Sequence, residues 1–148
     1  MDNSIQVLAG IIQLAVAPVF LLAGIAGFLN VMSGRLSRIV DRARIVELRV
    51  GTVTEEPRLS MTRVELRTLW RRVRLINWSI GMCTASGLSV CSVIVSLFIG
   101  HLWDLHIAQV VVSLFMLALL LLIVALVLFL KEVQLATRVL HAGREYPD

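Results

Sequence analysis

Three long stretches without a charged side chain constrain this chain more than any other feature of its sequence. They run over Asn3–Gly34, Leu75–Trp103 and Leu105–Leu130. A helix needs roughly 20 apolar residues to cross the hydrocarbon core of a bilayer, so each stretch is long enough to span it. The chain is also 58% hydrophobic, whereas soluble domains average about 45–50%. The sequence therefore predicts an all-α membrane protein with three transmembrane helices.

The predicted domain organisation follows from these stretches. We expect a single membrane domain of residues 1–148, with spans at about 5–32, 76–99 and 107–130, a cytoplasmic helical hairpin at about 33–75 and a cytoplasmic helical tail at 131–148. Small size and short connections agree with one domain.

The basic residues all lie on one side of the predicted spans. Eleven of the 14 fall between the first and second spans, and the other three follow the third span. The positive-inside rule therefore predicts a cytoplasmic hairpin and C-terminus, with the N-terminus outside. The net charge of +4 is then a topology signal that attracts anionic lipid headgroups, and no nucleic-acid partner is expected.

The segment between the first two spans shows a coiled-coil-like pattern. Apolar residues recur in alternating steps of three and four over Leu36, Ile39, Ala43, Val46 and Val50. The same steps recur over Leu66, Leu69, Val73, Ile76 and Ile80, which continue into the second span, and Leu59 lies seven residues before Leu66. This pattern predicts an antiparallel hairpin that extends both spans by roughly 25 Å into the cytoplasm. We expect Gly51 to end its first helix as a left-handed cap. We expect the second helix to begin at Ser60 or at Thr62, where Thr62 and Glu65 would form a capping box.

Arginines concentrate at the inner ends of the spans. Their simplest interpretation is a set of topology anchors with solvated ion pairs, and Asp41 lies within local pairing range of Arg38 and Arg44. A second interpretation is a site for a phospholipid headgroup or another anion, and a third is the vestibule of a pore. The candidates are Arg35, Arg38, Asp41, Arg42, Arg71, Arg72 and Arg74.

Small residues form a stripe on the first span. Gly10, Ala17 and Gly24 are seven residues apart, with Gly27 one turn further on. Small residues let helix backbones approach closely in lipid, so the stripe predicts a packing seam, either within the chain or between subunits. We expect a homo-oligomer.

Polar residues inside the spans allow two interpretations. They are Ser79, Ser86, Ser89 and Ser96 of the second span, with Gln13 and Asn30 of the first. The serines repeat at steps of seven, three and seven, which indicates one helical stripe. Such groups form hydrogen bonds between packed helices or line a polar path through the membrane.

No motif of an enzyme accompanies these features. The sequence contains no HExxH or CxxC motif and no glycine-rich phosphate loop, and the predicted spans hold no carboxylate. The loop residues His101, Asp104 and His106 are weak evidence for a metal site. We expect no catalytic activity, no cofactor and no metal.

Two neighbouring stretches resemble a known family. They read APVFLLAGIAGFLNV over residues 17–31 and RLSRIVDRAR over residues 35–44. Both are similar to the pattern of a bacterial family of small membrane proteins known as domain of unknown function 2721. The matching residues carried over are Asn30, Arg35, Arg38, Asp41 and Arg42. The resemblance implies this three-span architecture and a location in the bacterial inner membrane, and it implies no activity.

Two hypotheses for function follow. In the first, the chain is a homo-oligomeric membrane scaffold or accessory subunit whose basic hairpin contacts anionic lipid or a protein partner. In the alternative, it is a homo-oligomeric ion channel or small-solute pore, lined by the serine stripe of the second span with Gln13 or Asn30.

Overall fold

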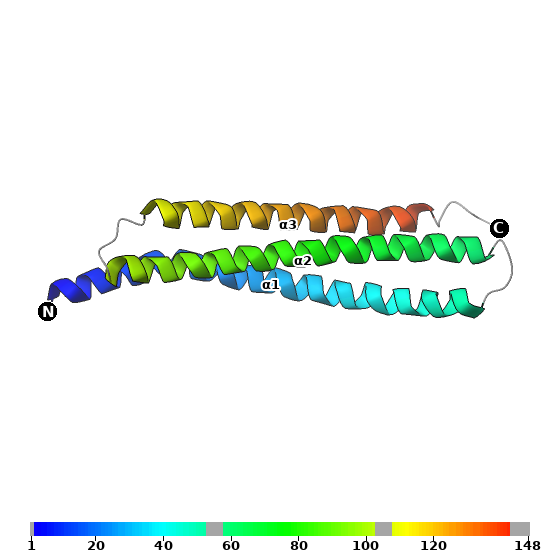
Figure 1. Ribbon diagram of the computed structural model, residues 1–148, viewed down its shortest axis with the longest axis horizontal. Coiled ribbons are helices and arrows are strands. Elements are labelled where there is room, and N and C mark those ends of the chain that lie inside the picture. Colours follow the sequence, from blue (N-terminus) through cyan, green and yellow to red (C-terminus); the bar gives the residue numbers. More distant parts are fainter. Residues whose placement is uncertain (1, 53–57, 103–107, 143–148) are drawn as a thin grey trace. The chain divides into compact units, whose positions relative to one another are not determined.

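In a computed structural model, the described part of the chain forms three long α-helices: α1 (Asp2–Thr52), α2 (Arg58–Leu102) and α3 (Ala108–Ala142) (Figure 1). The structure describes the backbone of residues 2–52, 58–102 and 108–142 and the side chains of residues 5–51, 59–100 and 108–136. These ranges contain no strand, and each helix is long and apolar enough to cross a membrane. The predicted all-α membrane class is confirmed.

The helices are longer than a bilayer requires. Helices α1, α2 and α3 contain 51, 45 and 35 residues. At 1.5 Å per residue, they extend for about 75, 70 and 50 Å, against a hydrocarbon core of about 30 Å. Part of each helix therefore lies outside the hydrocarbon.

Contacts between the helices define two compact units. The apolar unit comprises Met1–Leu29 and Gly81–Val124, and the charged unit comprises Asn30–Ile80 and Ala125–Asp148. All 14 Lys and Arg residues belong to the charged unit. The structural division thus follows the charge asymmetry of the sequence.

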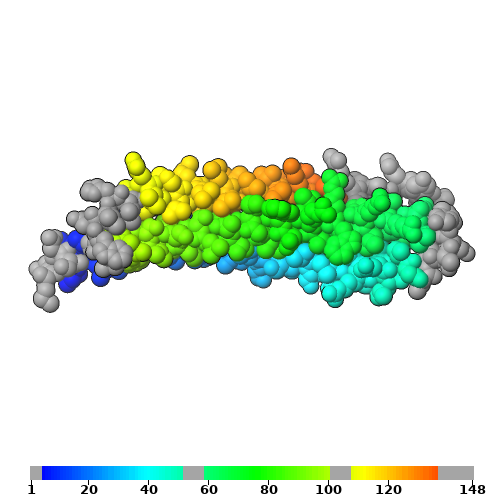
Figure 2. Space-filling view, viewed as in Figure 1, coloured from blue at the N-terminus to red at the C-terminus, as the bar shows by residue number. Residues whose placement is uncertain are grey.

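An apolar seam joins α1 and α2 in the charged unit. Its buried residues are Ile39, Ala43, Val46, Leu69 and Ile76, and the half-buried Leu36, Leu66, Val73 and Ile80 pack against them. Figure 2 shows the side chains of α1 (cyan) and α2 (green) closing on each other in this unit. The steps of three and four that the sequence shows are those of the seam. Each buried aliphatic side chain contributes about 1.5–3 kcal/mol, so the seam stabilises the two helices where they carry most of their charges.

The ends of this helix pair differ from the sequence prediction. Helix α1 continues through Gly51, which has a helical backbone, and α2 begins at Arg58, so Thr62 lies inside it. The predicted cap at Gly51 and the capping box of Thr62 with Glu65 are wrong. Glu65 accepts a hydrogen bond from Arg42 of α1. The connection at residues 53–57 lies outside the described residues.

In the apolar unit, Gly87 marks the close approach of α2 to α1. A Cβ atom at Gly87 would lie 3.6 Å from Cγ2 of Ile25 and 3.7 Å from Cδ1 of Leu22. These are ordinary van der Waals distances, so a methyl group fits there and a larger side chain does not. Helix α1 runs without interruption through the buried Pro18.

Two serine hydroxyls set the register between α2 and α3. In the charged unit, Oγ of Ser79 donates to the carbonyl of Ala125 at 2.6 Å. In the apolar unit, Oγ of Ser86 donates to the carbonyl of Ala118 at 2.7 Å. All four residues have an exposed fraction of 0%. The alanines let a hydroxyl reach the α3 backbone, and such a bond contributes about 0.6–1.7 kcal/mol in a membrane protein.

Candidate functional site: a carboxylate between two arginines

The same register brings two further residues together. Arg72 lies seven residues before Ser79 on α2, and Glu132 lies seven residues after Ala125 on α3. Among the described side chains, Glu132 is the charged residue that is fully buried, with an exposed fraction of 0%. A buried carboxylate costs several kcal/mol unless charged partners compensate it, so its surroundings define the candidate site.

Two arginines from different helices compensate Glu132. Arg72 of α2 donates from Nε at 3.1 Å and from Nη2 at 2.8 Å to Oε1. Arg35 of α1 donates from Nη1 to Oε2 at 2.9 Å. Both carboxylate oxygens therefore accept charge-assisted hydrogen bonds. This Arg35–Glu132–Arg72 triad ties together all three helices of the charged unit.

The arginines of the triad are held by more than their charge. Their side chains are 39% exposed for Arg35 and 19% for Arg72, so water has limited access to them. Cζ of Arg35 lies 5.3 Å from the centroid of the Phe129 ring, a cation–π contact that contributes about 0.5–2 kcal/mol. Lysine would keep the charge but lose the planar contacts, so the site requires guanidinium groups.

The triad lies where the three uncharged stretches end. Arg35 directly follows the first stretch, Arg72 lies three residues before the second, and Glu132 is the second residue after the third. On α2, the exposed Trp70 and Trp78 lie on either side of Arg72. Tryptophan concentrates at the level of lipid headgroups, so these residues indicate the same boundary.

A recess opens beside the triad. It measures about 170 Å³ and is lined by Arg35, Arg38, Ile39, Arg72 and Glu132. Arg38 is exposed and makes no ion pair or hydrogen bond with the described residues. Three guanidinium groups and one carboxylate give the lining a net charge of +2. Its chemistry suits an anion.

A second basic hollow of about 470 Å³ lies on α2. Its lining residues, here called the Trp70 patch, are Leu66, Arg67, Trp70, Arg71 and Arg74. The three arginines are exposed around the indole. An aromatic ring among cations is typical of a surface that meets lipid headgroups.

Comparison with known protein families matches residues 15–142 to a family described as "Protein of unknown function (DUF2721)". The chain belongs to this family. The match includes all three triad residues and confirms the DUF2721 resemblance of residues 17–31 and 35–44. No curated protein and no solved structure matches the chain. The DUF2721 description names no activity, so the function has to be argued from the site.

The structure divides the predicted arginine site among several places. Arg35 and Arg72 meet at Glu132, and Arg38 lines the adjoining recess. Arg42 instead forms an exposed ion pair with Glu65, with 3.0 Å between Nη2 and Oε1. The predicted residues Arg71 and Arg74 belong to the Trp70 patch.

Asp41 does not form the local pairs expected for it. It is exposed and makes no ion pair with Arg38, with Arg44 or with any other described residue. The expectation of such a pair is wrong. An exposed pair within one helix contributes only about 0.3–0.5 kcal/mol net, so little stability is lost when it does not form.

The serine stripe also divides. Ser79 and Ser86 are buried against α3, and half-buried Ser89 donates to the carbonyl of Ala85 in its own helix at 3.0 Å. Ser96 is half-buried. The other two polar candidates, Gln13 and Asn30 of α1, are exposed. The geometry favours the packing interpretation for Ser79 and Ser86, because their hydroxyls donate hydrogen bonds to backbone carbonyls of α3.

The stripe of small residues lies away from the contacts within the chain. Gly10, Ala17, Gly24 and Gly27 are all exposed, and a Cβ atom at each of the three glycines would meet nothing within 4 Å. The within-chain seam is therefore wrong for this stripe, because α1 packs through another face that includes Ala15 and Ile25. The seam between subunits stays a prediction.

Sequence reasoning missed Glu132. In the sequence, Glu132 resembles any polar residue that follows a membrane span. A pattern that points to its burial appears only when the sequences of α2 and α3 are compared. Ser86, Ser79 and Arg72 descend in steps of seven on α2, while Ala118, Ala125 and Glu132 ascend in steps of seven on α3. In antiparallel helices these two series match residue by residue.

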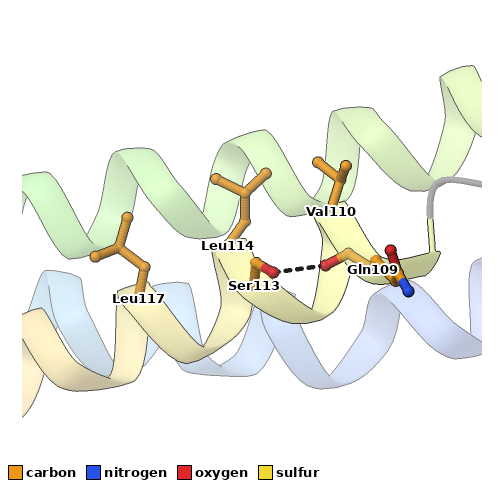
Figure 3. A pocket seen from close by; sticks show the side chains of 5 residues that line it. All are labelled: Gln109, Val110, Ser113, Leu114 and Leu117. Atoms are coloured by element: carbon orange, nitrogen blue, oxygen red, sulfur yellow. Dashed lines mark hydrogen bonds between the residues drawn. The ribbon is translucent and has the colours of Figure 1, made fainter.

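Another hollow lies along α3 and carries no comparable chemistry. It measures about 450 Å³ and is lined by Gln109, Val110, Ser113, Leu114 and Leu117 (Figure 3). Oγ of Ser113 donates to the carbonyl of Gln109 at 2.7 Å, so this hydroxyl is satisfied within the helix. All lining residues come from one helix, which makes the hollow an open surface feature.

The described side chains contain no group of three or more His, Cys, Asp or Glu that could hold a metal ion. The weak candidates His101, Asp104 and His106 lie outside the described residues. The expectation of a protein without metal stays a prediction.

Proposed function

We propose that the protein is a membrane scaffold or accessory subunit whose arginine-rich helices bind the anionic headgroups of the surrounding membrane. One observation carries this proposal. Six exposed arginines of the charged unit make no ion pair or hydrogen bond with the described residues: Arg38, Arg44, Arg63, Arg67, Arg71 and Arg74. Each basic group near an anionic membrane surface contributes about 1 kcal/mol of attraction.

The place of these charges supports lipid as the partner. Arg71 and Arg74 surround Trp70 directly before the second uncharged stretch begins at Leu75. Trp70 and Trp78 are 49% and 58% exposed, which suits rings that rest among headgroups. We propose that the protein lies in the bacterial inner membrane, with the charged unit on the cytoplasmic side and the N-terminus outside.

The build of the charged unit supports a scaffold. Its apolar seam and the Arg35–Glu132–Arg72 triad hold three helices together at the boundary of the uncharged stretches. The described residues thus present exposed arginines on helices that pack together, and the charged groups of the triad hold these helices. Such a surface suits docking of lipid or of a subunit rather than bond-making chemistry.

Lipid selectivity tests the proposal. The full chain, reconstituted in mixed bilayers, should enrich spin-labelled phosphatidylglycerol over phosphatidylcholine in its lipid shell, and salt should reduce the enrichment. The double variant Arg71→Gln/Arg74→Gln should weaken it by about fivefold per arginine at low salt. The matched control Arg44→Gln/Arg63→Gln removes the same charge about 15 Å further along the helices and should have a smaller effect. Unchanged enrichment in both variants would contradict lipid binding and favour a protein partner.

The pore alternative has less support from the geometry. Its proposed lining includes Ser79 and Ser86, whose side chains are wholly buried against α3 of their own chain. A continuous water path would need these hydroxyls to face it. Reconstituted protein that conducts ions, and loses conductance in Ser86→Ala, would reverse this preference.

A further inference from the structure

We propose that the recess between Arg35, Arg38 and Arg72 binds one phosphate group of an anionic lipid headgroup. The inference rests on the proposed lipid-binding function and deepens it by naming a single site. Membrane attraction through scattered arginines needs no pocket, whereas here three arginines from two helices line one recess of about 170 Å³.

The recess offers more hydrogen-bond donors than the protein uses. A guanidinium group carries five N–H donors. Glu132 accepts two of those of Arg72 and one of those of Arg35. Arg38 gives none to the described residues. Most donors around the recess therefore have no acceptor among the described residues, and phosphate oxygens match them in charge and geometry.

The carboxylate in the lining does not oppose an anion. Each Glu132 oxygen is covered by arginine N–H groups, at 2.8 and 3.1 Å for Oε1 and 2.9 Å for Oε2. The lining keeps a net charge of +2 after Glu132 is counted. Arg35 and Arg72 are also partly shielded from water, which strengthens a charge-assisted hydrogen bond relative to one at an exposed surface.

The volume of the recess and its position at the headgroup level indicate the phosphate of a lipid as its ligand. The recess measures about 170 Å³, which accommodates a phosphate group but not a whole lipid with its chains. Arg35 directly follows the first uncharged stretch, and Trp70 and Trp78 indicate the headgroup level on α2. A lipid phosphate therefore reaches the recess from the bilayer surface, while the rest of the lipid stays outside.

Arg38→Gln tests the site. Arg38 is exposed and unpaired among the described residues, so its loss should leave the melting temperature without lipid unchanged. Native mass spectrometry of the full chain in mild detergent should then show about tenfold weaker binding of phosphatidylglycerol and phosphatidic acid. Phosphatidylcholine serves as the zwitterionic lipid probe. Arg44→Gln removes the same charge at an exposed position of the same helix outside the recess, so it should weaken the binding of both anionic lipids much less than Arg38→Gln does. Equal losses in the two variants would overturn the site.

Further experiments identify the source of the phosphate and distinguish a failure of this inference from a failure of the proposed function. Inorganic phosphate and glycerol 3-phosphate should stabilise the lipid-free protein much less than phosphatidic acid does. Equal stabilisation by inorganic phosphate would overturn the lipid as ligand. If Arg38→Gln binds lipid normally while Arg71→Gln/Arg74→Gln loses lipid enrichment, the recess inference is wrong and the proposed function stands. If neither variant changes lipid binding, both are wrong.

Discussion

Glu132 is the described charged residue with the largest desolvation cost, because its side chain is fully buried. Two arginines flank it and compensate its charge. Desolvation of a buried ion pair often cancels its Coulomb attraction, so the triad need not add stability relative to an apolar contact. Loss of Glu132 is different, because Arg35 and Arg72, which are only 39% and 19% exposed, then face each other without a counter-charge. We therefore expect the triad to favour this arrangement of α1, α2 and α3 in the charged unit over others.

Glu132→Gln tests this asymmetry. The amide keeps the shape of the side chain but leaves Arg35 and Arg72 facing each other without a negative charge. We expect a destabilisation of about 3 kcal/mol, measured by thermal unfolding in detergent. Arg42→Gln is the control, since it removes one partner of an exposed pair and should cost less than about 1 kcal/mol. Equal losses in the two variants would show that the triad is no more important than a surface pair.

An apolar replacement of the whole triad separates stability from binding. Arg35→Met/Arg72→Met/Glu132→Leu removes both cations together with the buried carboxylate. We expect its stability to lie within about 2 kcal/mol of the unaltered protein, because no buried charge is left unpaired. Its preference for phosphatidic acid over phosphatidylcholine should be lost. Retention of that preference would show that the recess contributes nothing to lipid selectivity.

At the scale of the elements, small residues have two different roles. Gly87 and Ala118 lie in contacts between helices of the apolar unit, whereas Gly10 and Gly24 face open space. The sequence contains both kinds and does not distinguish them. Only the position of the neighbouring helix decides which small residues pack against another helix of the same chain.

Ala118→Leu probes the contact within the chain. The larger side chain enters the closely packed boundary with α2 and separates the hydroxyl of Ser86 from the α3 carbonyl. Overpacking and the lost hydrogen bond together should cost about 1–3 kcal/mol of unfolding free energy. Ala108→Leu, on the exposed surface of the same helix, should have no measurable effect. If the two variants melt together, α3 does not pack as closely as the structure shows.

Gly24→Leu probes the open stripe. A leucine fits there without any contact inside the chain, so the stability of the monomer should not change. If the stripe joins subunits, the variant should weaken self-association by about tenfold in detergent, measured by sedimentation equilibrium. Gly81→Leu is the matched control, because Gly81 of α2 also faces open space but lies outside the stripe. Normal association of Gly24→Leu would exclude this stripe as the seam.

Sequence periodicity predicted the elements better than their pairing. Steps of three and four identify the seam residues Ile39 and Leu69, because apolar spacing depends on one helix at a time. Glu132 could not be recognised in this way, since its burial depends on the register between α2 and α3. The ends at Thr52 and Arg58 were missed because Gly51 and Thr62 lie inside the helices, so these capping signals in the sequence do not mark helix ends.

At the scale of the whole molecule, charge segregation and structural division describe the same boundary. The charged unit contains every Lys and Arg, and the apolar unit contains only Asp2 and Asp104 as charged residues. Helices α1 and α2 are long enough that each contains a segment of the apolar unit and a segment of the charged unit. The lipid proposal requires that all the arginines reach the same side of the membrane.

Fusion reporters test this orientation. Green fluorescent protein joined after Asp148 should fluoresce in a bacterial host, and alkaline phosphatase at the same place should be inactive, because both report a cytoplasmic C-terminus. Reporters placed after Asp104 should behave in the opposite way, because the connection between α2 and α3 then lies outside. Replacing Lys131, Arg138 and Arg144 by Gln is a graded control, since eleven basic residues between the first two uncharged stretches still fix the orientation. An active phosphatase after Asp148 would place the arginines on the outer surface, where the cytoplasmic lipid and partner proposals both fail.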